Sequence, residues 1–245
     1  EESEIYLTVQ NRNQTSMGIL RVDSVTGDVE EIYRWTDEYW VEIISGAPKV
    51  IGEHIVTVED RGEARALVVD NVQISSSDIQ IRSLIHCDNK GVVTAVSENP
   101  LEQHIMHFDL DGKATQLSKG AGVHDAVSNG SLTVIQSRSM DFDGVQTSIY
   151  IKNVQIAEVE DRSENPVITL NANFHTLGER SLETVVLFPL NHDNSTPLPV
   201  ILDPYGGPHA QRVRSARGLF GVSQWFADQG FAVIVTDGRG TPGRS

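Results

Sequence analysis

Residues 198–240 read LPVILDPYGGPHAQRVRSARGLFGVSQWFADQGFAVIVTDGRG, and this stretch decides the fold. It holds two short apolar runs, 199–203 and 231–236, which predict β-strands because they are rich in β-branched residues. Between them, residues 210–229 carry apolar side chains at a helical spacing, and Gly230 follows where a helix would end. A strand, a helix and a second strand form a βαβ unit, which predicts a parallel sheet in an α/β domain.

Upstream of this unit, four short β-type runs recur at spacings of about 40 to 45 residues. The runs end at Asp23, Asp70, Asp109 and Asn153. Such residues favour tight turns because their side chains can accept hydrogen bonds from the backbone two residues on. Three or four short strands per repeat are typical of the blades of a β-propeller. We therefore expect residues 1–165 to form a partial propeller of three to four blades, with an ordinary β-sandwich as the alternative.

The composition argues against two classes of partner. The chain has 19 Lys and Arg against 34 Asp and Glu, for a net charge of −15. That charge repels phosphate backbones and anionic lipids, so we expect no nucleic acid and no membrane as partners. No run approaches ~18 apolar residues, the length of a membrane span. Cys87 has no second cysteine to pair with, and the N-terminus lacks a signal-peptide pattern, so we expect a cytoplasmic protein.

Two segments, 198–209 and 225–240, resemble the start of the catalytic domain in the prolyl oligopeptidase family of serine peptidases. The dipeptidyl peptidase IV and acylaminoacyl peptidase branch is the most similar, and residues 103–118 resemble its final propeller blades. The resemblance implies a mixed fold in two domains. Residues 1–165 would be the C-terminal blades of a β-propeller, and residues 166–245 the N-terminal portion of an α/β-hydrolase peptidase domain.

The resemblance also implies one catalytic residue. In this family the Tyr of the Tyr-Gly-Gly-Pro turn donates to the oxyanion of the tetrahedral intermediate, and that residue here is Tyr205. A fixed phenol donor is useful because it can meet charge that develops only in the transition state. Gly206 and Gly207 would let substrate approach the backbone closely. The alternative is that Tyr205 merely ends a strand and that the glycines form an ordinary turn.

The rest of the catalytic machinery is expected outside this chain. The sequence contains no Gly-x-Ser-x-Gly elbow, and Ser245 lies too early to be the nucleophile of this family. We assign no nucleophile, acid or base, and expect the chain alone to be inactive. His104 and His107 suggest a metal site, but residues three apart on a strand point to opposite faces. We therefore expect no metal and no cofactor.

These observations predict the function of the parent protein. The resemblance implies a serine exopeptidase of the dipeptidyl or acylaminoacyl type, which cleaves short peptides by acyl transfer through a serine ester. Its partner would be a peptide substrate, and self-association into a homo-oligomer stays open. One alternative is a non-catalytic propeller module that binds a protein. Another is an esterase, because the fold alone does not decide the chemistry.

Overall fold

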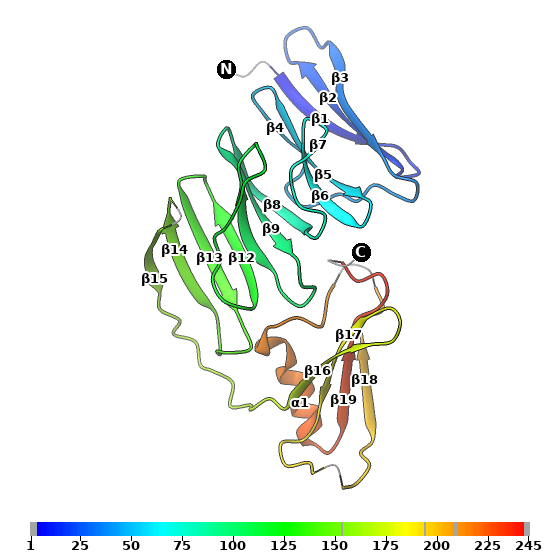
Figure 1. The fold of residues 1–245 in the computed structure, drawn as a ribbon, viewed down its shortest axis with the longest axis vertical. Helices are drawn as coiled ribbons and strands as arrows, with labels where there is room; N and C mark the ends of the chain where they lie inside the picture. The colour runs from blue at the N-terminus through cyan, green and yellow to red at the C-terminus, as the bar shows by residue number, and fades with distance from the viewer. Residues whose placement is uncertain (1–3, 153, 194, 208–209, 243–245) are drawn as a thin grey trace. The chain divides into compact units, whose positions relative to one another are not determined.

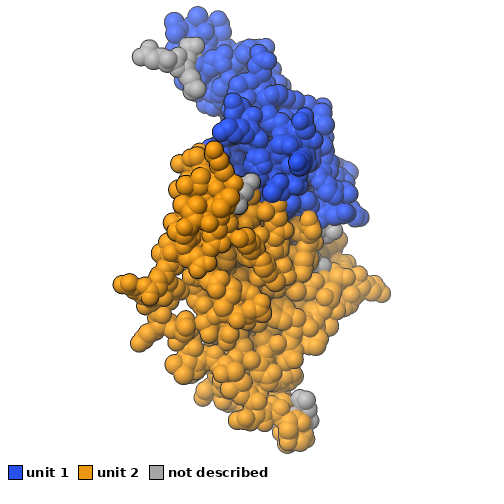
Figure 2. Space-filling view, turned by 60° about the vertical axis from the view of Figure 1, so that its left-hand side comes forward, with its two compact units in different colours: residues 1–96, 106–115, 245 blue, residues 97–105, 116–244 orange. Residues whose placement is uncertain are grey.

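The computed structural model describes residues 4–152, 154–193, 195–207 and 210–242 (Figure 1). Five small sheets account for the strands of these residues. The chain divides into two compact units (Figure 2). Unit 1 contains residues 1–96 and 106–115, and unit 2 contains residues 97–105 and 116–244. This division does not fall at residue 165, so the assignment of 1–165 and 166–245 to two domains stays a prediction.

Four sheets, which we call blades, follow one another along residues 4–159, and in each the strands pair in sequence order. The first blade is β1 (Glu4–Gln10), β2 (Ser16–Asp23) and β3 (Val29–Thr36). The second is β4 (Lys49–Ile51), β5 (His54–Arg61), β6 (Ala64–Val69) and β7 (Val72–Gln73). The third is β8 (Gln80–Asp88), β9 (Gly91–Ser97), β10 (His104–Phe108) and β11 (Ala114–Gln116). The fourth is β12 (Val123–Ser128), β13 (Leu132–Arg138), β14 (Gln146–Ile151) and β15 (Val154–Val159).

The repeated runs of the sequence take the same place in every blade. They form β2, β6, β10 and β14, each the last strand but one of its sheet. The predicted turns differ in detail. Asp23 and Asp109 each accept backbone N–H groups of their own turn, from Val25 at 2.7 Å and from Lys113 at 2.8 Å. Asp70 instead accepts the N–H of Ile55 on the neighbouring strand, and Asn153 lies outside the described residues.

The core of unit 1 lies where the second and third blades contribute buried side chains. Val56, Leu67, Ile81 and Val92 are all fully buried and belong to one apolar cluster with Phe108. Burying a side chain of this size contributes about 1.5–3 kcal/mol. Strand β9 is buried along its whole length, and so on both faces of its sheet, which a single blade alone cannot achieve.

Unit 2 also contains a mixed sheet in the order β16-β17-β19-β18. Its strands are β16 (Ala172–Leu177), β17 (Leu182–Leu187), β18 (Val200–Pro204) and β19 (Ala232–Thr236). Strands β18 and β19 pair in parallel, as the βαβ pattern predicts. Strand β17 pairs antiparallel with both β16 and β19. Val185, Val213, Phe220 and Val235 form the centre of its apolar core.

The helix between the two parallel strands is shorter than predicted. The sequence predicts a helix over 210–229, but the 3₁₀ helix η1 begins only at Arg217 and α1 spans Gly221–Asp228. The prediction is wrong for residues 210–216 because the Asp237 carboxylate accepts the backbone N–H of Arg212, an interaction from outside the segment. Gly230 ends the helical region as predicted, with a φ of +98° that suits glycine. No helix in the described residues is long and apolar enough to cross a membrane.

Candidate functional site

Tyr205 lies at the end of the sheet where the two parallel strands finish. It follows β18 directly, and the pairing of Pro204 with Thr236 places Asp237 at the same end. A β-carbon on Gly238 would lie 3.8 Å from the Tyr205 carbonyl oxygen, so the two loops are neighbours. In open α/β sheets, ligands bind beyond the carboxyl ends of the strands. The structure therefore places Tyr205 at the edge where a substrate site is expected.

The Tyr205 side chain folds back over Gly207. A β-carbon on residue 207 would lie 2.9 Å from Tyr205 Oη and 3.0 Å from Cζ. Real β-carbons do not approach another heavy atom this closely, so this position of the ring requires glycine at 207. The Tyr205 side chain is half-buried, and within the described part of the chain its hydroxyl has no hydrogen-bond partner. Among the described residues, therefore, nothing accepts a hydrogen bond from this phenol.

Gly206 has different surroundings from Gly207. Its two chain neighbours aside, no atom of the described residues lies within 4 Å of the place where its β-carbon would be, and the residue is exposed. The two glycines were predicted to serve the same purpose, as backbone that substrate can approach. The structure separates them, because Gly207 makes room for the Tyr205 ring and Gly206 borders open space. Pro208 and His209, the next residues of the motif, lie outside the described residues.

Comparisons with known proteins agree on one group of enzymes. No family model matches the chain. The probable dipeptidyl-aminopeptidase B of Arthroderma gypseum is 27% identical over 164 residues, which is 60% of this chain and 18% of that protein. The crystal structure of dipeptidyl peptidase 4 from Porphyromonas gingivalis superposes with a TM-score of 0.83 at 19% identity and covers 99% of this chain and 37% of that one.

A putative dipeptidyl aminopeptidase IV from Bacteroides ovatus gives a TM-score of 0.79 at 16% identity and covers 99% of this chain and 40% of that one. The chain is thus similar in sequence to a dipeptidyl-aminopeptidase and in fold to dipeptidyl peptidase IV enzymes. The predicted resemblance is confirmed, and so are the propeller blades of the predicted fold. This dipeptidyl peptidase IV-like chain spans well under half the length of each of the relatives named here.

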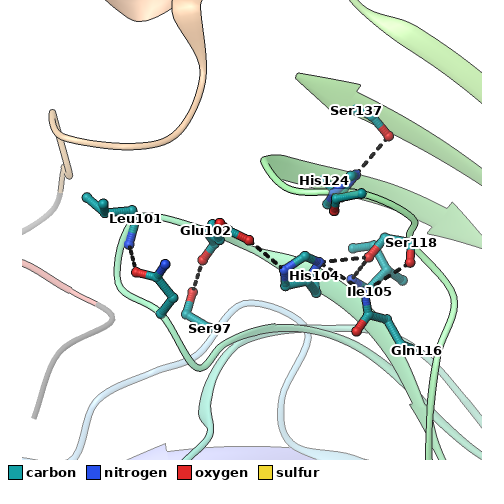
Figure 3. Close-up of polar contacts among 11 residues, drawn as sticks. Ser97, Leu101, Glu102, His104, Ile105, Gln116, Ser118, His124 and Ser137 are labelled. Atoms are coloured by element: carbon teal, nitrogen blue, oxygen red, sulfur yellow. Dashed lines mark hydrogen bonds and ion pairs between the residues drawn. The ribbon is translucent and has the colours of Figure 1, made fainter. Parts of the chain in front are cut away.

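A second polar cluster of the dipeptidyl peptidase IV-like chain surrounds two stacked histidines (Figure 3). The rings of His104 and His124 lie 5.3 Å apart. His104 Nε2 is 3.0 Å from a Glu102 carboxylate oxygen, and His104 Nδ1 is 3.2 Å from Ser118 Oγ. Sequence reasoning missed this cluster because its members come from separate strands and loops. Their approach depends on strand pairing, which leaves no fixed spacing in the sequence.

The order Ser118, His104, Glu102 is the order of groups in an acyl-transfer triad, but the site cannot act as one. Ser118 is only 4% exposed, so a peptide carbonyl cannot reach its hydroxyl. Its Oγ also accepts the backbone N–H of Ile105 at 3.0 Å. A nucleophile needs an accessible oxygen beside its base. We interpret the cluster as structural.

His124 is held in its neutral form by its surroundings. It is 1% exposed, with Nδ1 2.8 Å from Ser137 Oγ and Nε2 3.2 Å from the Gly120 carbonyl oxygen. Burial lowers the pKa of His124, and the nearby His104 lowers it further, although the Gly120 carbonyl opposes the shift. The ring therefore donates one hydrogen bond and accepts another without carrying charge.

His107 and Ser245 are the other residues considered from sequence. His107 is on β10 with His104, and a β-carbon on Gly91 would meet its Nε2 at 2.9 Å. No group of three His, Cys, Asp or Glu with metal-binding geometry occurs in the described residues. A cavity of about 20 Å³, enough for a water-sized group, lies in unit 1 beside Trp35 and Trp40, whereas Tyr205 belongs to unit 2. Ser245 lies outside the described residues.

Proposed function

We propose that the whole protein is a serine exopeptidase of the dipeptidyl or acylaminoacyl type, and that Tyr205 donates to the oxyanion. The relatives named above are dipeptidyl peptidases, which supports a peptidase and peptide substrates. The finer assignment depends on one observation. Tyr205 presents a hydroxyl that has no hydrogen-bond partner among the described residues, directly after a parallel strand and against Gly207.

The chemistry follows from this position. Attack on a peptide carbonyl concentrates negative charge on its oxygen, and a donor fixed before the reaction stabilises that charge without reorganising. The phenol of Tyr205 is held by its place directly after β18 and by its packing over Gly207. Removing a donor of this kind typically lowers kcat by about 100- to 1000-fold.

The mixed sheet supports the proposal that residues 166–245 begin an α/β-hydrolase domain. Its parallel pair β18–β19, connected through α1, places the Tyr205 turn at the carboxyl ends of the strands. In this fold a Gly-x-Ser-x-Gly elbow supplies the nucleophile, followed along the chain by the acid and then the histidine. The sequence of this chain contains no such elbow, so we propose that the chain alone is inactive.

The lone cysteine supports a further proposal, that the protein works in a reducing, cytoplasmic setting. Cys87 is free, and burial raises the pKa of its thiol to about 11. A half-buried thiol with a raised pKa reacts slowly, which suits a structural role. Whether the protein forms a homo-oligomer stays a prediction.

Kinetics of the whole protein test the proposed function. Aminoacyl-proline and acyl-alanine p-nitroanilides would be compared with a simple ester. We expect turnover of a peptide-like anilide, and a fall in kcat for Tyr205→Phe that far exceeds any rise in KM, because the donor acts in the transition state. Turnover of the ester alone would indicate an esterase, and no turnover would favour a binding module. Wild-type kinetics for Tyr205→Phe would remove this residue from the mechanism.

A further inference from the structure

We infer that Arg212 is a positioning residue for Tyr205, a role that rests on the proposed function. Arg212 is bound through its side chain to the strand before the Tyr205 turn and through its backbone to the loop after β19. Asp203 and Arg212, which lie on the two sides of Tyr205 in the sequence, are thereby joined. Arg212 contacts no reacting atom and acts through the geometry of that turn.

The first contact is a two-point ion pair. Arg212 Nη1 lies 3.0 Å from Asp203 Oδ1, and Nη2 lies 2.6 Å from Oδ2. Asp203 is in β18, two residues before Tyr205. A guanidinium and a carboxylate joined by two parallel hydrogen bonds have a fixed relative orientation. The pair therefore fixes where the chain returns after the Tyr205 turn.

The second contact fixes the backbone of Arg212. Its N–H donates to Asp237 Oδ1 at 2.8 Å, and the N–H of Val213 donates to Oδ2 at 3.2 Å. Asp237 is 1% exposed and directly follows β19, the strand that pairs in parallel with β18. Because both carboxylate oxygens bind consecutive backbone groups, residues 212 and 213 are held against the end of the sheet.

These contacts hold the described residues on both sides of the Tyr205 turn, 204–207 and 210–213. One end leaves β18 and the other is tied to β18 by the ion pair and to β19 by Asp237. Within this segment the Tyr205 ring lies over Gly207. A side chain held at both ends of its loop loses fewer conformations when substrate arrives, which is how positioning raises kcat.

The ion pair is partly exposed, so its effect on the position of the turn can be separated from its effect on folding. The Arg212 and Asp203 side chains are each 34% exposed, and partly exposed ion pairs add little to global stability. Removing the pair should therefore free the turn without unfolding the protein. Arg217 provides a matched control, because its ion pair with Asp143 spans 2.8 Å at similar exposure, 26% and 35%, and involves no residue of the turn.

The experiment uses the whole protein with Arg212→Met, Arg212→Lys and the control Arg217→Met, each alone and combined with Tyr205→Phe. We expect Arg212→Met to lower kcat by about 10- to 100-fold with little change in KM, since small misplacements of a catalytic group cost this much. Lysine keeps the positive charge but cannot make the two parallel hydrogen bonds of the guanidinium, so Arg212→Lys should recover only part of kcat. Hydrogen exchange of residues 204–213 should rise in Arg212→Met and not in Arg217→Met.

The combined variants decide whether Arg212 acts through Tyr205. If it does, adding Arg212→Met to Tyr205→Phe should cost little more, because the positioned donor is already gone. The inference would be overturned by equal losses of kcat in Arg212→Met and Arg217→Met. It would also be overturned if the loss of kcat in Arg212→Met added fully to that of Tyr205→Phe. Normal activity of Tyr205→Phe would instead overturn the proposed function, so the two failures are distinguishable.

Discussion

The hydroxyl of Tyr205 lies so close to Gly207 that a β-carbon on residue 207 would stand 2.9 Å from Tyr205 Oη. Because of this contact, the orientation of the Tyr205 ring depends on residue 207 being glycine. Neither Gly206 nor Gly207 is among the glycines with positive φ. The requirement for glycine at 207 is therefore one of space, and it depends on where the Tyr205 ring lies.

The two glycines can be separated by substitution. We expect Gly207→Ala to displace the Tyr205 ring and to lower kcat of the whole protein by about 10-fold or more. Gly206→Ala is the control, because its added methyl group would have no described atom within 4 Å apart from those of its two chain neighbours. Steady-state kinetics on an aminoacyl-proline anilide would measure both. Equal kcat values for the two variants would contradict the proposed orientation of Tyr205.

Gln224 should stabilise the junction of α1 with the mixed sheet. Its side chain is fully buried, accepts the N–H of Asn171 at 2.7 Å and donates to the Phe188 carbonyl oxygen at 3.0 Å. We expect Gln224→Leu to lower the free energy of unfolding by about 2–3 kcal/mol, because it leaves buried backbone groups unpaired. Urea unfolding would measure the loss.

The exposed Gln229 at the end of the same helix serves as the control for Gln224. Among the described residues, its amide donates only to the Trp225 carbonyl oxygen, at 3.5 Å. Gln229→Leu should change the free energy of unfolding by less than about 0.5 kcal/mol, as most surface substitutions do. If Gln224→Leu and Gln229→Leu changed the free energy of unfolding by similar amounts, hydrogen bonding by Gln224 would be unimportant for stability.

His124 should make stability depend on pH. Its pKa is lowered in the folded state relative to the ordinary value of 6.5, mainly by burial. The unfolded state therefore binds the proton first as pH falls, so the stability is fully present above about 6.5 and is lost as pH falls through the folded pKa. His104, Glu102 and Asp125 are the charged neighbours that modify this titration.

Urea unfolding between about pH 8 and pH 5 would test the role of His124. His124→Gln should flatten the loss of stability at acid pH, whereas substitution of the exposed His175 by Gln should leave it unchanged. An unaltered pH profile in the His124→Gln variant would mean that other groups cause the acid loss. The comparison uses the slope of the free energy of unfolding against pH, so a loss of stability that is the same at every pH does not affect it.

Cys87 should be a slow thiol in the native protein. Burial raises the pKa of this thiol to about 11, so little thiolate is present near neutral pH. We expect an aromatic disulfide reagent to modify Cys87 slowly at about pH 8 and at the rate of a free thiol after denaturation. Fast modification of the folded protein would show that the residue is more accessible than the structure indicates.

The sequence predicted local structure well where neighbouring residues decide it. The repeated runs each became the last strand but one of a blade, and the strands of the βαβ unit became β18 and β19. The helix between them was predicted too early in the chain, because Asp237 binds the backbone of Arg212 from 25 residues away. Strand β16 was missed, since the alternation of apolar and polar residues in it covers only residues 172–175.

By itself, the sequence determined the blades and the parallel pair, and its resemblance to a known family implied that Tyr205 is a candidate donor. Periodicity and turn chemistry act over a few residues, so they can be read along the chain. Only the tertiary structure decided that Gly207 makes room for the Tyr205 ring and that Arg212 closes its turn. The same holds for the stacking of His104 on His124. These contacts depend on strand register and on how the loops close. Both bring together residues that are not neighbours in the sequence, so no local sequence pattern predicts them.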